Sequence, residues 1–412
     1  MAKKKERTEF KKQNYVSNFQ LVGKVKLADK SFEIDSQSQK SNWTYSRANF
    51  GIDCGPDHGL VFVTAMGGFS NVGDQMIYAH GKDSNGRDDF GIRLEINWSD
   101  RLDPEFVEQA GRMSLVSAAL ERDTKGKLFY KNYLSKYDLV EYLSEHLQDG
   151  MTVYARGDIK YQFYNDSTSC NFELTSIALS DAEENEYYAK FTQTLLLDAD
   201  SKGEIDKENG EIDITGYALE YAKDYRGIDI KDKDGRGQTV PIPYNFKYKI
   251  SEEMKKNPEI AKKAISKLFS MKKKDSVSQI TFEGVCVSTG ATVTLTSADL
   301  PDDLRELITL SIMTEEEAIA SCATNGNRER KMVLLRPRVR MVNNDDGSSS
   351  PQVQIFEDMY SVEDLDYFRT MSKPEEPEPM EDGDMNAPEE ADEVESGGKK
   401  EDDDNMSWLD DL

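Results

Sequence analysis

The chain has 412 residues, of which 32% are charged and 37% hydrophobic, and its formal net charge is −26 at pH 7. This length predicts two or three domains, and no stretch reaches the roughly 18 apolar residues that a membrane span needs. The basic N-terminus has no apolar segment behind it and the four cysteines lie far apart, so we expect a cytoplasmic protein with reduced cysteines, no secretory signal and no membrane contact.

The negative charge is concentrated at the C-terminus. Residues 374–412 hold 17 acidic and two basic side chains, a net charge of −15. Residues 1–373 hold the other 61 acidic and 50 basic side chains, a net charge of −11. The low isoelectric point, about 4.6, therefore does not exclude a surface that binds phosphates.

The first half begins with a predicted flexible basic arm over residues 1–15, followed by a domain over residues 16–181. Apolar residues recur there with period two, which predicts strands near residues 19–27, 42–54, 59–66, 91–98, 113–120, 151–165 and 171–179. A helix is predicted from Ser135, which suits an N-cap, to Leu147.

The second half, over residues 187–372, repeats this plan. Asn257 and Pro258 suit the start of a helix that runs to Phe269, and a strand over residues 279–287 follows it. Further helices are expected near residues 302–312 and 314–322, before a last strand over residues 330–342. With one helix before the fourth strand of each half, the pattern predicts a mainly β fold with a few helices, built as two small Greek-key barrels.

Motifs of catalysis are absent from the sequence. It contains no phosphate-binding GxxxxGK[ST] loop, no GxGxxG after a strand and no HExxH. The segment from Asp198 resembles a calcium loop, but Lys202 and Asn209 stand where ligands belong. We therefore expect a protein that is not an enzyme and needs no metal or cofactor.

Two predicted strands each present a face that mixes aromatic and basic side chains, and a loop between them adds two more such residues. These candidate residues are Trp43, Tyr45, Arg47, Tyr130, Lys131, Tyr154, Arg156, Lys160 and Tyr164. Single-stranded nucleic acid is held by bases stacked on rings and by phosphates beside Lys or Arg, so we interpret the two faces as a binding surface on neighbouring strands. For each residue alone, a half-exposed position on a strand is the simpler explanation.

The last predicted strand places Arg336, Arg338 and Arg340 on one side. Three like charges in a row require an anionic partner. The acidic body, the acidic tail and a bound nucleic acid all remain candidates for that partner.

The C-terminal segment, residues 373–412, is rich in acids and proline and is predicted to be a disordered tail. A solubilising role would explain its acids but not the apolar tip. Trp408, Leu409 and Leu412, with Asp410 and Asp411 between them, are typical of a peptide that docks into a pocket with a basic rim.

Together, a barrel with aromatic and basic strand faces and an acidic tail with an apolar tip resembles the single-stranded DNA-binding proteins. The segment YDLVEYLSEHLQDGMTVYARGDIK is similar to their helix, Gly turn and following strand, and DDDNMSWLDDL is similar to their acidic tip. The resemblance implies OB-fold barrels and a tail that competes with DNA and recruits partners. The overall organisation is most similar to proteins of tailed-phage replication modules.

The function predicted from the sequence is therefore binding of single-stranded DNA in phage DNA replication or recombination, in the host cytoplasm if a phage encodes the chain. The tip would recruit replication or recombination proteins, and self-association into a homo-oligomer stays open. Two alternatives remain: a phage structural or assembly protein with a docking tail, and an inhibitor that mimics DNA through its negative charge.

Overall fold

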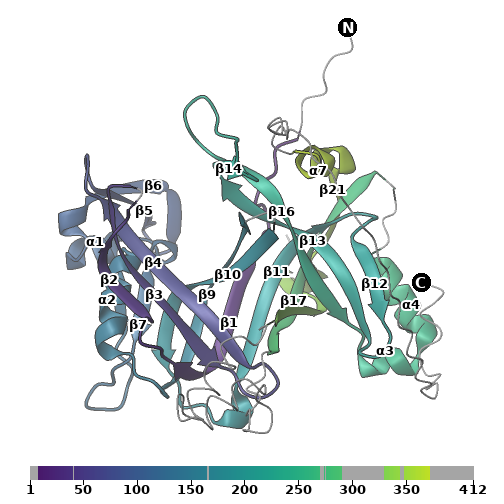
Figure 1. Ribbon diagram of the computed structural model, residues 1–412, viewed down its shortest axis with the longest axis horizontal. Helices are drawn as coiled ribbons and strands as arrows, with labels where there is room; N and C mark the ends of the chain where they lie inside the picture. The colour runs from purple at the N-terminus through teal and green to yellow at the C-terminus, as the bar shows by residue number, and fades with distance from the viewer. Residues whose placement is uncertain are drawn as a thin grey trace, which may run out of the picture.

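The computed structural model describes residues 8–39, 41–164, 167–269, 273, 275–289, 329–343 and 348–371. The helices expected near residues 302–312 and 314–322 and the tail over residues 373–412 lie outside them. Within the described residues the fold is mainly β with a few helices, as the period-two patterns predicted. Two barrels lie side by side, the first on the left of Figure 1 and the second on the right.

Five strands of the first half close into a ring, in the order β1 (Ser17–Lys26), β3 (Trp43–Asp53), β4 (Leu60–Ser70), β10 (Ser167–Leu179) and β9 (Thr152–Tyr164). Strand β9 pairs again with β1, and every pair is antiparallel except β4 with β10. Helix α2 (Lys136–His146) precedes β9, the fourth ring strand along the chain. This order is that of the five-stranded Greek-key barrel called the OB fold.

The start of α2 lies where the sequence predicted it. The Ser135 hydroxyl accepts a hydrogen bond from the backbone N–H of Tyr137 at 3.1 Å, which satisfies one of the free donors of the first turn. Leu139 and Leu143 are fully buried against the barrel. The apolar stripe therefore positions the helix across one end of the sheet.

A second ring repeats this strand order with β11 (Tyr188–Leu197), β13 (Glu211–Ala222), β16 (Gln238–Lys249), β18 (Glu329–Pro337) and β17 (Ser276–Thr289). Again one pair, β16 with β18, is parallel, and the others are antiparallel. Helices α3 (Glu252–Lys256) and α4 (Pro258–Phe269) precede β17. The prediction of two barrels with the same plan is confirmed.

The barrels are joined through their first strands. Strand β1 pairs antiparallel with β11 from Ser17 to Val22, so one sheet runs through both rings. A carboxylate strengthens the junction: Glu220 on β13, only 8% exposed, accepts hydrogen bonds from the backbone N–H of Tyr161 at 3.2 Å and from Lys12 at 3.0 Å. The two barrels are therefore held together by hydrogen bonds and side-chain packing as well as by the chain that connects them.

Residues 8–15 differ from the flexible arm that the sequence predicted. Phe10 is buried, with its ring centroid 4.7 Å from that of Tyr360. The Tyr15 hydroxyl accepts a hydrogen bond from the backbone N–H of Leu219 at 2.9 Å. These two aromatic residues hold the segment against the second barrel. The many lysines around them are the reason that the sequence predicted a flexible segment.

Between β4 and α2, residues 71–134 form what we call the insert, whose strands β5 and β6 lie at the upper left of Figure 1. Its elements are β5 (Met76–Lys82), β6 (Asp88–Asn97), α1 (Pro104–Gln109), β7 (Val116–Ala119) and β8 (Lys131–Tyr133). Strands β5 and β6 form a separate two-stranded sheet over a small core of Ile96, Ala110 and Leu134, whereas β7 and β8 extend the main sheet beside β10.

The remaining elements lie at the edges of the two rings. They are β2 (Phe32–Gln37) beside β3, β12 (Lys202–Asp206) beside β13, the hairpins β14 (Asp224–Tyr225) with β15 (Ile228–Asp229) and β19 (Val339–Asn343) with β20 (Ser349–Val353), then β21 (Ile355–Ser361) beside β17, and α7 (Val362–Arg369). Across the described parts of the chain, no helix is both long and apolar enough to span a bilayer.

Candidate nucleic-acid interface

The outward face of β3 carries the aromatic residues that the sequence singled out. Thr44, Ser46 and Ala48 point into the barrel and are buried, whereas Trp43, Tyr45 and Arg47 alternate with them on the outside. The Trp43 and Tyr45 rings are stacked, with centroids 5.4 Å apart and planes 23° apart. Met66 on β4, opposite Arg47 and 48% exposed, continues this surface, which we call the Trp43 face.

Two glycines of β4 shape this region, and no pattern in the sequence singled them out. A Cβ on Gly68 would lie 2.1 Å from the carbonyl oxygen of Thr44 and 2.9 Å from the Trp43 ring. A Cβ on Gly67 would lie 2.3 Å from the backbone nitrogen of Tyr137. Glycine is therefore required on one side for the Trp43 ring to lie close to the strand, and on the other for the first turn of α2 to pack.

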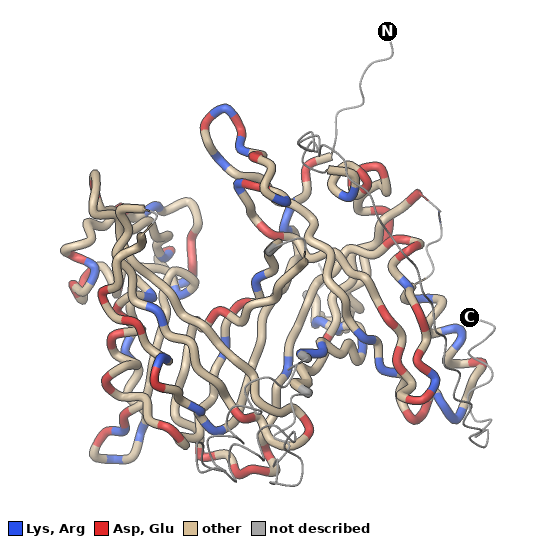
Figure 2. Tube along the Cα trace, viewed as in Figure 1, with Lys and Arg blue, Asp and Glu red and all other residues tan. Residues whose placement is uncertain are grey.

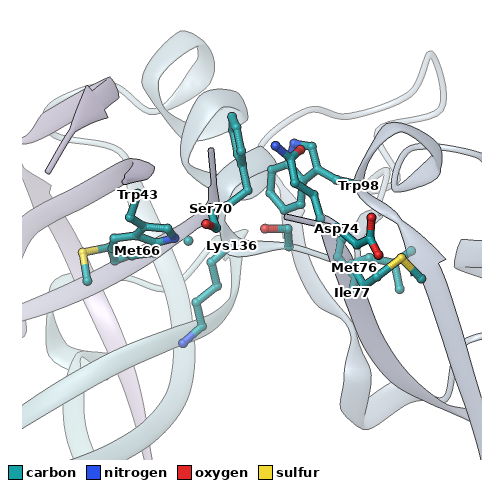
Figure 3. A pocket seen from close by; sticks show the side chains of 14 residues that line it. Trp43, Met66, Ser70, Asp74, Met76, Ile77, Trp98 and Lys136 are labelled. Carbon is teal, nitrogen blue, oxygen red and sulfur yellow. The ribbon is translucent and has the colours of Figure 1, made fainter. Parts of the chain in front are cut away.

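A cleft of about 520 Å³ separates the Trp43 face from the insert, a volume in the usual range of ligand sites. Figure 3 shows Trp43 and Met66 on one side and Trp98, Asp74, Met76 and Ile77 on the other. The lining is completed by Gly67, Gly68, Phe69, Ser70, Gln75, Leu134, Ser135 and Lys136. Trp98, which the sequence pattern did not single out as a site residue, is thus a wall of this cleft.

The insert is anchored to the barrel through Trp98 and Arg101. The Trp98 ring packs 4.8 Å from Phe69 and edge-on to Tyr137 at 5.5 Å, and the Arg101 guanidinium lies 4.5 Å from the Trp98 ring centroid. Arg101 also donates from Nε to both carboxylate oxygens of Asp138, at 3.0 and 3.2 Å. Burial raises the pKa of Asp138 and Arg101 opposes that rise, so the cation offsets part of the cost of burying this carboxylate.

Several of the predicted cations already have carboxylate partners. Arg47 donates to Glu33 on β2 at 2.8 Å, and Tyr45 contacts the same carboxylate. The other pairs are Lys131 with Glu121 at 2.7 Å, Lys160 with Glu220 at 3.9 Å and Arg336 with Glu283 at 2.9 Å. Acidic and basic residues are interspersed over both barrels (Figure 2). Exposed pairs contribute at most about 1 kcal/mol each, so a phosphate can displace the acid.

The sequence suggested that the two aromatic strand faces lie on neighbouring strands. The structure shows that they do not. Tyr154, Arg156 and Lys160 do point outward from β9, but β1 lies between β9 and β3 in the ring. Because the sheet curves round the barrel, the two faces point in different directions. Nothing is described for the Tyr164 side chain.

The loop residues and the arginine strand also lie away from the Trp43 face. Tyr130 is exposed just before β8, and the Lys131 ammonium lies 4.4 Å from the Tyr142 ring centroid. The predicted arginine strand is interrupted at Arg338, whose backbone N–H donates to Thr281 at 2.7 Å. Arg336 therefore lies near the end of β18 while Arg340 belongs to the β19–β20 hairpin, so the three arginines do not form one row. The tip residues Trp408, Leu409, Asp410, Asp411 and Leu412 are outside the described residues.

A second groove of about 810 Å³ lies where the start of β10 meets β13 and β16 of the second barrel. Its lining includes Thr168, Thr215, Tyr244, Asn245, Phe246, Lys247, Arg330 and Lys331. Arg330 donates to the carbonyl oxygen of Cys170 at 3.1 Å and lies 4.8 Å from the Phe172 ring centroid. The sequence pattern offered no signal for this groove, because residues from both barrels build it.

Among the described residues, no group of His, Cys, Asp and Glu is arranged to hold a metal ion. No protein-family model and no curated protein matches the chain. Among solved structures it is similar to the wild-type single-stranded DNA binding protein from Thermus aquaticus, with 9% identity over 66% of this chain and 86% of that chain and a TM-score of 0.27.

A deletion mutant of the same Thermus aquaticus protein matches with 10% identity over 67% of this chain and 89% of that chain, at a TM-score of 0.29. TM-scores this low add nothing to the strand pairings, on which the OB fold assignment of both barrels rests.

Proposed function

We propose that the chain is a non-catalytic protein that binds single-stranded DNA through the Trp43 face of its first barrel. The observation that carries this proposal is the stacked pair of Trp43 and Tyr45 on the outside of a closed barrel, beside Met66 and an open cleft. Strands two and three of an OB barrel, here β3 and β4, bind oligonucleotides in many proteins of this fold. Every base has a flat face, so such a platform binds single strands with little sequence preference.

The second groove extends the proposed path toward the second barrel, with Arg330 and Lys331 beside Tyr244. Tyr154, Arg156 and Lys160 point away from the Trp43 face. We propose that they contact the DNA where its path continues round the barrel. Tyr130, Lys131, Arg336, Arg338 and Arg340 are proposed as outlying contacts of the same kind.

The biological setting proposed is DNA replication or recombination of a phage, and it rests on the sequence resemblance alone. The acidic tail would compete with DNA for the cations of the body, and DNA binding would then free Trp408, Leu409 and Leu412 for a partner protein. The Thermus aquaticus proteins bind single-stranded DNA according to their names.

The proposed function is tested by binding of the full chain to a fluorescent thymidine oligonucleotide at 50 and 200 mM salt. We expect tight binding at low salt and a loss of roughly tenfold or more at the higher salt, because each neutralised phosphate releases counterions. The proposal is contradicted if the oligonucleotide binds neither the full chain nor a chain ending at residue 371 at 50 mM salt.

The pair formed by Arg47 and Glu33 yields a gain-of-function test. Replacing Glu33 with Gln (Glu33→Gln) should raise the affinity for the oligonucleotide about two- to fivefold, because it frees Arg47 for a phosphate at the cost of a surface pair worth about 1 kcal/mol or less. The salt dependence should steepen by about one counterion. The same charge change at Glu259→Gln on α4 controls for net charge, and an equal gain there would remove the special role of Arg47.

A further inference from the structure

Of the two similar barrels, only the first one contains the insert. In the second barrel, Ile250 and Ser251 alone separate β16 from α3. In the first barrel, residues 71–134 occupy the corresponding place between β4 and α2. The cleft beside the Trp43 face exists because of these residues, so it can do something that the bare barrel face cannot.

The two walls of the cleft differ in chemistry. The barrel wall is mainly apolar, with Trp43 and Met66 around two glycines. The insert wall combines Met76 and Ile77 with the polar side chains of Asp74 and Gln75. Asp74 is exposed and, within the described part of the chain, its carboxylate makes no hydrogen bond or ion pair. A flat apolar group with hydrogen-bond donors on one edge therefore fits between the walls.

Phosphate groups are disfavoured in the same place. Asp74 is negative, and the nearest cation in the lining, Lys136, already donates to Glu173 at 2.8 Å. A nucleotide bound here would keep its phosphate outside, toward Arg47, and insert only its base. The charge distribution thus selects the base over the backbone.

Resting on the proposed function, we propose that this cleft takes one unstacked base and reads its pairing edge through Asp74. A carboxylate only accepts hydrogen bonds, so it favours cytosine, adenine and guanine, whose edges carry amino groups. Thymine offers a single N–H between two carbonyl oxygens, and these oxygens face the carboxylate unfavourably. The protein then has a base preference superimposed on general single-strand binding.

The preference is tested with the full chain at pH 7.5 and two pyrimidine oligonucleotides of equal length, oligo-dC and oligo-dT. We expect oligo-dC to bind roughly fivefold or more tightly than oligo-dT, the size expected from a matched contact at a base edge. In Asp74→Asn the ratio should fall to about one, because the amide can donate to thymine as well as accept from cytosine. Glu95→Gln, which changes the same charge on β6 of the insert, should keep the wild-type ratio.

The possible outcomes separate this inference from the proposed function. If both oligonucleotides bind but Asp74→Asn leaves their ratio unchanged, base reading is overturned and single-strand binding stands. If neither oligonucleotide binds, the proposed function itself fails. A synthetic peptide of residues 401–412 whose affinity changes in Asp74→Asn, with the dC-to-dT ratio unaltered, would assign the cleft to a peptide and overturn the inference.

Discussion

Replacing Trp43 and Tyr45 together with Ala should lower the affinity for an oligo-dT by about 2–4 kcal/mol, a loss of about 30- to 1000-fold. Each stacked base contributes about 1–3 kcal/mol, and the two rings are stacked on each other on the Trp43 face, where bases can continue the stack. Both rings project from the outside of β3, so the buried core stays intact. Fluorescence anisotropy at fixed salt measures the change.

A matched control comes from the insert. Tyr78 is 75% exposed on β5 and does not line the cleft, so Tyr78→Ala removes an exposed ring without touching the Trp43 face. Its affinity should equal that of the wild type. Phe at both positions keeps the rings and should retain most of the binding. If Trp43→Ala with Tyr45→Ala binds normally while its melting curve is unchanged, the Trp43 face is not the interface.

Period-two patterns predicted the strand faces well because a strand has only two sides. Once Thr44, Ala48 and Phe50 are assigned to the core, Trp43 and Tyr45 must lie outside, and the structure confirms it. The repetition of one barrel plan in both halves was predicted from the same patterns, although the second half places two helices, α3 and α4, before its fourth strand. Local periodicity was sufficient for these features.

Neighbour relations between distant segments could not be predicted in the same way. Arg47 meets Glu33 only because β2 pairs with β3 in one register, and a shift by one residue would separate them. The separation of β9 from β3 by β1 is a property of the closed ring, which no single strand encodes. The second groove needs residues from both barrels and was likewise hidden.

The insert shows how stability and the candidate site are connected. Trp98 contributes to the cleft, and its position depends on Phe69, Tyr137 and Arg101. Arg101 in turn neutralises Asp138 inside the fold. A change at this ion pair, outside the cleft lining, should therefore alter both folding stability and the geometry of the cleft.

Arg101→Ala should lower the free energy of unfolding by about 3 kcal/mol at neutral pH, because it leaves Asp138, only 3% exposed, as an uncompensated buried carboxylate. Burial already raises the pKa of Asp138 in the folded state, and without Arg101 that pKa rises further. A carboxyl with a raised folded pKa stabilises the fold below its unfolded pKa, near 4, and this contribution is lost as the pH rises through the folded value. Urea unfolding should therefore show a larger deficit at pH 7.5 than at pH 5.

Two variants separate the buried charge from a general loss of contacts. Asp138→Asn added to Arg101→Ala removes the carboxylate, so it should restore part of the stability and abolish the extra loss at pH 7.5. Arg122→Ala breaks an exposed ion pair with Asp181 and should cost at most about 1 kcal/mol at either pH. If Arg101→Ala and Arg122→Ala cost the same, Arg101 does not anchor the insert. Oligonucleotide binding by a folded Arg101→Ala chain then measures how far the cleft depends on this anchor. A displaced Trp98 should reduce the preference for oligo-dC, while binding to oligo-dT persists.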